Sequence, residues 1–187
     1  MTPLPDAYSR ITNPERFHAL VSHALAVFDH LRATYDVTEH ASFEPLPALL
    51  APFEPARPPI TLVPAAPDAA ALGMAFTRFP GVIMRYGRWH ATPFPSCGCD
   101  ACNENAQEEA VRLDFLVRRV VAGQFTEELR TPLLFGDAHL SHRLGCSDNG
   151  DGCTAGWTSI PRSVARSIRG NASRITRWQP WSHKRGL

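Results

Sequence analysis

Lysine is almost absent from this chain of 187 residues: Lys184 is the only one, so nearly every basic residue is an arginine. The shortage excludes a phosphate-binding loop, which requires Gly-Lys-Ser/Thr. It also argues against a pyridoxal Schiff base or a kinase-type lysine, because either would have to use Lys184, close to the last residue. Two large classes of enzyme are therefore improbable on composition alone.

Long apolar runs are also missing. No stretch approaches the roughly 20 apolar residues that a membrane span requires. The first residues lack a charged region followed by an apolar core, so a secretory signal is not expected. We therefore expect a cytoplasmic protein without membrane contact, in which five cysteines are reduced thiols or metal ligands. No Gly-x-Ser-x-Gly or Gly-x-Gly-x-x-Gly motif is present.

Acidic residues are absent after Asp151, although the whole chain is nearly neutral, with 19 Lys+Arg against 18 Asp+Glu. The net charge of +1 gives no bulk electrostatic argument for nucleic acid. A basic, partly loose segment is nevertheless expected over residues 161–187. Its Trp178 and Trp181 could stack on bases while arginines track phosphates, but we favour packing of both indoles on the body. The length predicts a single domain over residues 1–187.

Helix and strand patterns alternate in a way that predicts an α+β fold, with an antiparallel sheet built from hairpins and two main amphipathic helices packed on it. The helices are expected over residues 14–35 and 100–122. A central hairpin turns at Pro80-Gly81. Further strands are expected at 60–63 (an edge strand), 125–129, 139–144 and 154–160.

Three cysteines within six residues form the most informative motif: Cys97, Cys99 and Cys102. Side chains two apart in an extended segment point the same way, and residues three apart share a helical face. Gly98 allows a tight turn between them. The three sulfurs can therefore converge on one soft divalent ion, and zinc is the expected metal.

A closed tetrahedral site needs a fourth ligand, and Cys146 is the predicted one, with Cys153 and His90 as alternatives. Cys146 and Cys153 could instead close a small disulfide around the Gly- and Asp-rich turn between them. The cluster could also work as a redox or nucleophilic thiol, or could simply be buried as small apolar residues. Whether the protein is an enzyme stays open at this point.

Other titratable groups give weaker signals. His139 and His142 lie three apart on a predicted strand, so they face opposite sides and cannot share one ion. Glu127 and Glu128 are expected on a solvated face, as are Glu108 and Glu109.

Several stretches resemble a family of bacterial proteins known only as a domain of unknown function. They are Tyr8-Ser-Arg-Ile-Thr-Asn-Pro-Glu-Arg-Phe17, Phe79-Pro-Gly81, Arg85-Tyr-Gly-Arg-Trp-His90, Phe94-Pro-Ser-Cys-Gly-Cys-Asp-Ala-Cys102 and Trp178-Gln-Pro-Trp181. The resemblance implies a cytoplasmic protein and brings no activity, partner or catalytic residue. The leading hypothesis is a non-enzymatic module with a structural zinc-type site. A thiol enzyme and a nucleic-acid-associated protein acting through its tail are the alternatives.

Overall fold

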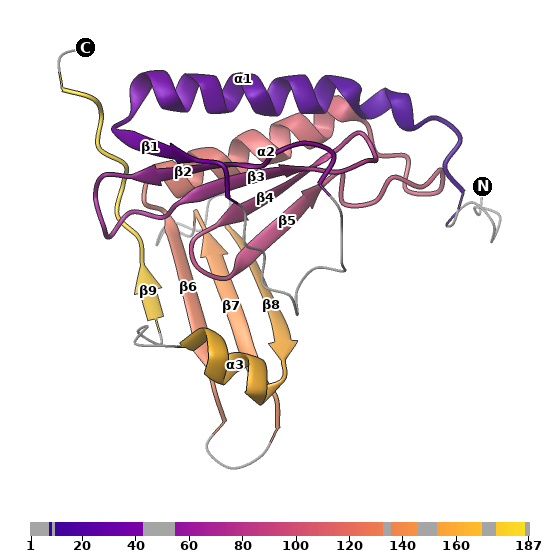
Figure 1. Ribbon diagram of the computed structural model, residues 1–187. Coiled ribbons are helices and arrows are strands. Elements are labelled where there is room, and N and C mark those ends of the chain that lie inside the picture. Colours follow the sequence, from indigo (N-terminus) through magenta and orange to yellow (C-terminus); the bar gives the residue numbers. More distant parts are fainter. Residues whose placement is uncertain are drawn as a thin grey trace.

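The computed structural model describes residues 8, 10–42, 55–132, 136–145, 153–169 and 175–185, and it contains two antiparallel sheets (Figure 1). The first sheet has the order β1-β2-β3-β4-β5, and the second has the order β8-β7-β6-β9. The predicted α+β class and the antiparallel pairing are confirmed, with the strands divided between two sheets. The first sheet comprises β1 (Val37–His40), β2 (Ile60–Pro64), β3 (Leu72–Phe76), β4 (Val82–Tyr86) and β5 (His90–Phe94). The second comprises β6 (Phe125–Arg130), β7 (Ala138–Leu144), β8 (Thr154–Ile160) and β9 (Ile175–Arg177).

Two helices share the main core with the first sheet. A 3-10 turn, η2 (Pro14–Phe17), leads into α1 (His18–Thr34), as the proline at the first helical position predicts. The second helix, α2 (Ala106–Val121), packs beside α1. Both contribute their apolar stripes to one cluster with the even-numbered residues of β3 and β4. The buried residues of α1 are Leu20, Ala24, Phe28 and Leu31.

The second sheet has a smaller core of its own. The third helix, α3 (Arg162–Arg169), crosses one face of β6, β7 and β8 in Figure 1. Its Ala165 is buried with Leu129, Leu140 and Ile160, and Trp89 joins them from the turn after β4. The opposite face of this sheet carries Glu128, Arg130 and Arg143 and is not part of either core.

Residues 178–184, here called the terminal strap, bind the two halves of the molecule together. Trp178 and Trp181 are both buried in the main core, so the interpretation in which the indoles pack on the body is confirmed. The Trp181 amide donates to the Val121 carbonyl at the end of α2, and the Lys184 amide donates to the Thr34 carbonyl at the end of α1. The tryptophans are therefore not available for stacking on bases.

Several boundaries differ from expectation. Ile60–Pro64 is an inner strand, not an edge strand, because the unpredicted β1 pairs with it. The unpredicted β5 contains Pro93, which is tolerated because β5 lies at the edge of its sheet. α2 begins at Ala106, six residues later than predicted, because Asn105 caps it. Within the described ranges, none of the helices has the length and apolar character needed to cross a membrane.

Candidate metal centre

The loop between β5 and α2 brings three free thiols together. The Cys97 and Cys99 sulfurs are 3.1 Å apart, and the Cys99 and Cys102 sulfurs are 3.4 Å apart. All three sulfurs lie within 4.8 Å of one another. Cys99 is buried, Cys97 is half-buried and Cys102 is exposed. The site is therefore a cluster of sulfur ligands that is buried at Cys99 and exposed to solvent at Cys102.

These separations are close to those that a metal ion would require. Tetrahedral ligands at about 2.3 Å from zinc are about 3.8 Å from one another. The observed separations are somewhat shorter than this, and a disulfide at about 2.05 Å would be much shorter. Small movements of the side chains would place all three sulfurs around one soft ion. Cys97, Cys99 and Cys102 are thus brought together as the spacing of the motif predicted.

The thiols also influence one another's ionisation. Hydrogen bonds with Cys97, first, and with Cys102 lower the pKa of Cys99. Contacts with Cys99, first, and with Cys97 raise the pKa of Cys102 to about 12. Three thiolates at this distance repel one another, so full ionisation of the cluster requires a cation between them.

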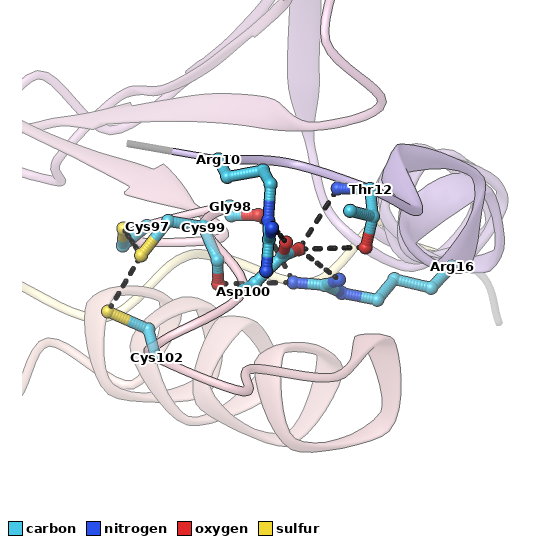
Figure 2. A network of polar contacts seen from close by, with 8 residues as sticks. All are labelled: Arg10, Thr12, Arg16, Cys97, Gly98, Cys99, Asp100 and Cys102. Carbon is cyan, nitrogen blue, oxygen red and sulfur yellow. Dashed lines mark hydrogen bonds and ion pairs between the residues drawn. The ribbon is translucent and has the colours of Figure 1, made fainter. Parts of the chain in front are cut away.

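Asp100 fixes the loop to the N-terminal segment, as Figure 2 shows. Its Oδ1 accepts hydrogen bonds from the amide and the hydroxyl of Thr12 at 3.0 and 3.1 Å. Its Oδ2 accepts from Arg10 Nε at 3.2 Å, and the Asp100 amide donates to the Arg10 carbonyl. The Thr12 amide is the main cause of the lowered pKa of the Asp100 carboxyl. Asp100 therefore holds a distant segment of chain and does not cap α2.

Other contacts set the shape of the same loop. Arg16 donates to the Gly98 carbonyl at 3.1 Å and lies near Asp100 in Figure 2. The Glu104 carboxylate accepts from the Cys97 amide at 2.9 Å. A Cβ at position 98 would lie 2.4 Å from the Phe79 ring, so only glycine fits there without a shift of that ring. Backbone and side-chain contacts thus hold the loop in the conformation that gathers the sulfurs.

The fourth ligand is not found among the described residues. Cys146 lies outside them, so its role as a ligand stays a prediction. Cys153 is disulfide-bonded, and its sulfur is not a free thiolate while that bond holds. His90 does not belong to the group of metal-competent residues, because its imidazole lies in the core against His142 and Phe125. His90 therefore does not lie where it could be the fourth ligand.

A buried polar cluster around Glu127 was missed by sequence reasoning. Glu127 is fully buried, not solvated as expected, because β6 alternates and places residues 125, 127 and 129 inward. It accepts hydrogen bonds from the Arg88 amide and from Trp178 Nε1, and His90 Nε2 lies 3.7 Å from its Oε2. The alternation of Phe125 and Leu129 around it was the signal that could have revealed it.

The histidines of β7 and the second acidic pair give mixed outcomes. His139 and His142 lie on opposite faces of β7, as predicted: His139 contacts Trp157, and His142 contacts His90. Glu109 is buried although a solvated position was expected, whereas Glu108 is exposed. The stripe of α2 is wide enough to include Glu109, whose carboxylate is paired with Arg112 at 2.5 Å.

Comparison with known proteins places this chain in one family over almost its whole length. A family model described as a family of unknown function (DUF6226) matches residues 1–185. No curated protein matches the chain. No solved structure matches it either. Function must therefore be argued from the geometry of the site.

Proposed function

We propose that this chain, which belongs to the family of unknown function DUF6226, is a non-enzymatic module that holds one zinc-type metal ion at Cys97, Cys99 and Cys102. The observation that carries the proposal is the convergence of three free thiols within 4.8 Å. Thiolate sulfur is the ligand type that zinc prefers in structural sites. The ion would supply positive charge to a cluster that cannot ionise fully alone.

A structural role follows from what the loop connects. The ligands lie between the end of β5 and the start of α2, and Asp100 ties the same loop to Thr12 and Arg10. Metal bound to the three thiolates would lock these segments together. Because metal binding and folding are linked, removal of the ion would loosen the loop and lower the stability of the protein.

Metal analysis of protein purified without a polyhistidine tag, under reducing conditions, tests the proposal. About one equivalent of zinc per chain is expected, lost in Cys99→Ser and kept in Ser96→Ala, a matched change at an exposed neighbour. Cobalt substitution should give the strong thiolate charge-transfer band of tetrahedral sulfur coordination. Substoichiometric metal in the parent protein, with thermal unfolding unchanged by a chelator, would contradict the proposal.

Cys146→Ser tests the predicted fourth ligand. If Cys146 completes the site, this variant binds zinc more weakly than the parent protein, and its cobalt spectrum shows fewer sulfur ligands. An unchanged spectrum would assign the fourth position to water or to another residue. The proposal of a site at the three thiols is tested by Cys99→Ser and not by this variant.

Asp100→Asn tests whether the anchoring of the loop supports the ligands. Partners that orient metal ligands typically contribute about 10- to 100-fold in affinity. We expect a loss of that size in competition with a chromophoric chelator. Asp29→Asn, an exposed change on α1, should leave the affinity unchanged.

A thiol-based redox or nucleophilic activity is the second candidate, favoured by the lowered pKa of Cys99. Alkylation rates measured against pH on metal-free protein distinguish it. A single thiol that reacts rapidly below neutral pH, in protein that binds no metal, would favour this candidate over the structural site.

A further inference from the structure

One face of the second sheet points away from both cores, and we call it the outer face. The strand register arranges its side chains in three rows across the sheet. The middle row is Trp157, Ser141, Glu128 and Ile175. The flanking rows are Ala155, Arg143, Thr126 and Arg177 on one side and Ser159, His139 and Arg130 on the other.

Arginine dominates the charge of this face. Arg130, Arg143 and Arg177 are all exposed, and Glu128 is the one carboxylate in the three rows. Arg130 Nε lies 2.7 Å from the Glu128 carboxylate and compensates it. Neither Arg143 nor Arg177 has an ion-pair partner within the described part of the chain. The outer face therefore presents two uncompensated guanidinium groups, carried by backbone positions two strand spacings, about 10 Å, apart.

Trp157 is the second unusual feature of the outer face. The chain has four tryptophans, and Trp89, Trp178 and Trp181 are at most 8% exposed, whereas Trp157 is 73% exposed. Ile175, at the other end of the same row, is 48% exposed. An indole exposed on a sheet offers a planar apolar surface to a ligand, and tryptophan is enriched at interfaces for this reason.

The face is also hollowed. A groove of about 740 Å³ runs over Glu128, Arg143 and Arg177, and a second of about 380 Å³ runs over Arg130, His139 and Trp157. Both are lined by Glu128, Arg130, Ser141 and Arg143, so they meet on the sheet. Helix α3 covers the opposite face of the same strands, so it leaves this surface open (Figure 1).

We infer that the outer face binds single-stranded nucleic acid. Unpaired bases would stack on the Trp157 indole, and Arg143 and Arg177 would contact successive parts of the phosphate backbone. This combination of an aromatic platform and guanidinium groups on a sheet is the chemistry that recognises a flexible, stackable polyanion. Trp178 and Trp181 of the tail are buried, so the inference places binding on the outer face, to which residues 161–187 contribute only Ile175 and Arg177.

Fluorescence anisotropy with labelled mixed-sequence RNA and DNA 12-mers tests the inference on the full chain. Binding should weaken about tenfold between 50 and 200 mM salt, as expected for two to three phosphate contacts. Trp157→Ala should weaken oligonucleotide binding about five- to a hundredfold, and Trp157→Phe, which keeps an aromatic ring, should weaken it less. Unlabelled oligonucleotide should quench the tryptophan fluorescence of the parent protein, with the quenching lost in Trp157→Phe.

A charge-matched control separates the face from net charge. Arg143→Gln/Arg177→Gln should weaken binding and flatten its salt dependence, whereas Arg118→Gln/Arg185→Gln, with the same net charge, should not. Equal effects of the two double variants would overturn the inference, as would the absence of binding at 50 mM salt. A sedimentation coefficient of Trp157→Ala that differs from that of the parent protein would also overturn the inference, because the face would then join copies of the chain.

Discussion

Glu127 is a fully buried carboxyl group whose hydrogen-bond partners offset only part of the cost of burying its charge. Burial raises its pKa to about 7, and the amide and charge of Arg88 oppose that shift only in part. Beside it, burial lowers the pKa of His90 to about 3, with the nearby His142 as the second cause. His90 Nε2 has no hydrogen-bond partner. The pair therefore prefers to be uncharged in the folded protein.

The sign of the pH dependence follows from these directions. The folded protein holds the Glu127 proton more tightly than the unfolded chain, so stability is lost as the pH rises from about 4.5 to about 7. Glu127→Gln removes this dependence, and its amide can donate to His90 Nε2. We expect the variant to gain about 2–3 kcal/mol relative to the parent between pH 5 and pH 8. Urea unfolding at the two pH values measures the difference.

His90 supplies the internal control for that measurement. Its lowered pKa destabilises the folded state in acid, below about pH 6.5, in both the parent and the variant, so this loss is measured in each protein separately. A stability difference that does not change between pH 5 and pH 8 would show that Glu127 is ionised in the same way in the folded and unfolded chains.

The start of α2 shows how a short segment is set by one cap. The Asn105 side chain accepts a hydrogen bond from the Glu108 amide at 2.9 Å, and Glu108 and Glu109 lie in the first turn, where negative charge is favourable. Asn103 has a positive φ of 50° and reverses the chain just before the cap. The loop that carries the cysteines is thereby kept out of the helix.

Asn105→Ala should lower the free energy of unfolding by about 1 kcal/mol, because the Glu108 amide loses its acceptor. Denaturant titration of the full chain gives the value. Asn105→Asp keeps an acceptor at the cap and should be close to neutral. A loss of the same size in both variants would mean that the amide group of Asn105, and not the cap, is what matters.

Local patterns in the sequence were sufficient for much of this architecture. The spacing from Phe17 to Leu31 was visible as helical periodicity, and turn residues marked the hairpin at Pro80-Gly81 and the strands on either side of the Gly- and Asp-rich segment. The cysteine spacing likewise predicted that the sulfurs meet. The start of α2 was misplaced because Asp100 and Asn105 are both good caps, and only the distant Thr12 and Arg10 decide that Asp100 binds elsewhere.

Pairings between distant segments were the part that sequence could not supply. β1 is short and polar, so its alignment on β2 depends on the sheet already being present. β9 has three residues and is recognisable as a strand only once it lies against β6. Glu127 was assigned to solvent because its neighbour Glu128 suggested a polar face, whereas the strand separates the two side chains.

At the scale of the whole molecule, the terminal strap joins elements that are otherwise far apart. Trp181 is 4% exposed, and its Nε1 donates to the Ala70 carbonyl at 2.8 Å. Its ring lies edge-on to Tyr35 at a centroid distance of 5.7 Å. One side chain thus contacts the end of α1, the segment before β3 and the main core.

Trp181→Ala should lower the free energy of unfolding by about 3–5 kcal/mol, since it leaves a large cavity and an unsatisfied carbonyl. Trp157→Ala is the matched control, because the exposed indole leaves no cavity and should change stability by less than about 0.5 kcal/mol. Thermal and urea unfolding of both variants provide the comparison. Similar losses in the two variants would show that Trp181 contributes no more than surface packing.

The strap also has a consequence for biosynthesis. Trp181 and Ala70, which it joins, are 111 positions apart in the sequence. The Thr34 carbonyl at the end of α1 accepts its hydrogen bond from the Lys184 amide. During translation the main core therefore lacks the side chains of Trp178 and Trp181 until the end of synthesis. The core can be completed only after residue 184 has been translated. Until then its unfilled apolar surface is exposed to chaperones and proteases, so premature termination would yield a fragment marked for degradation.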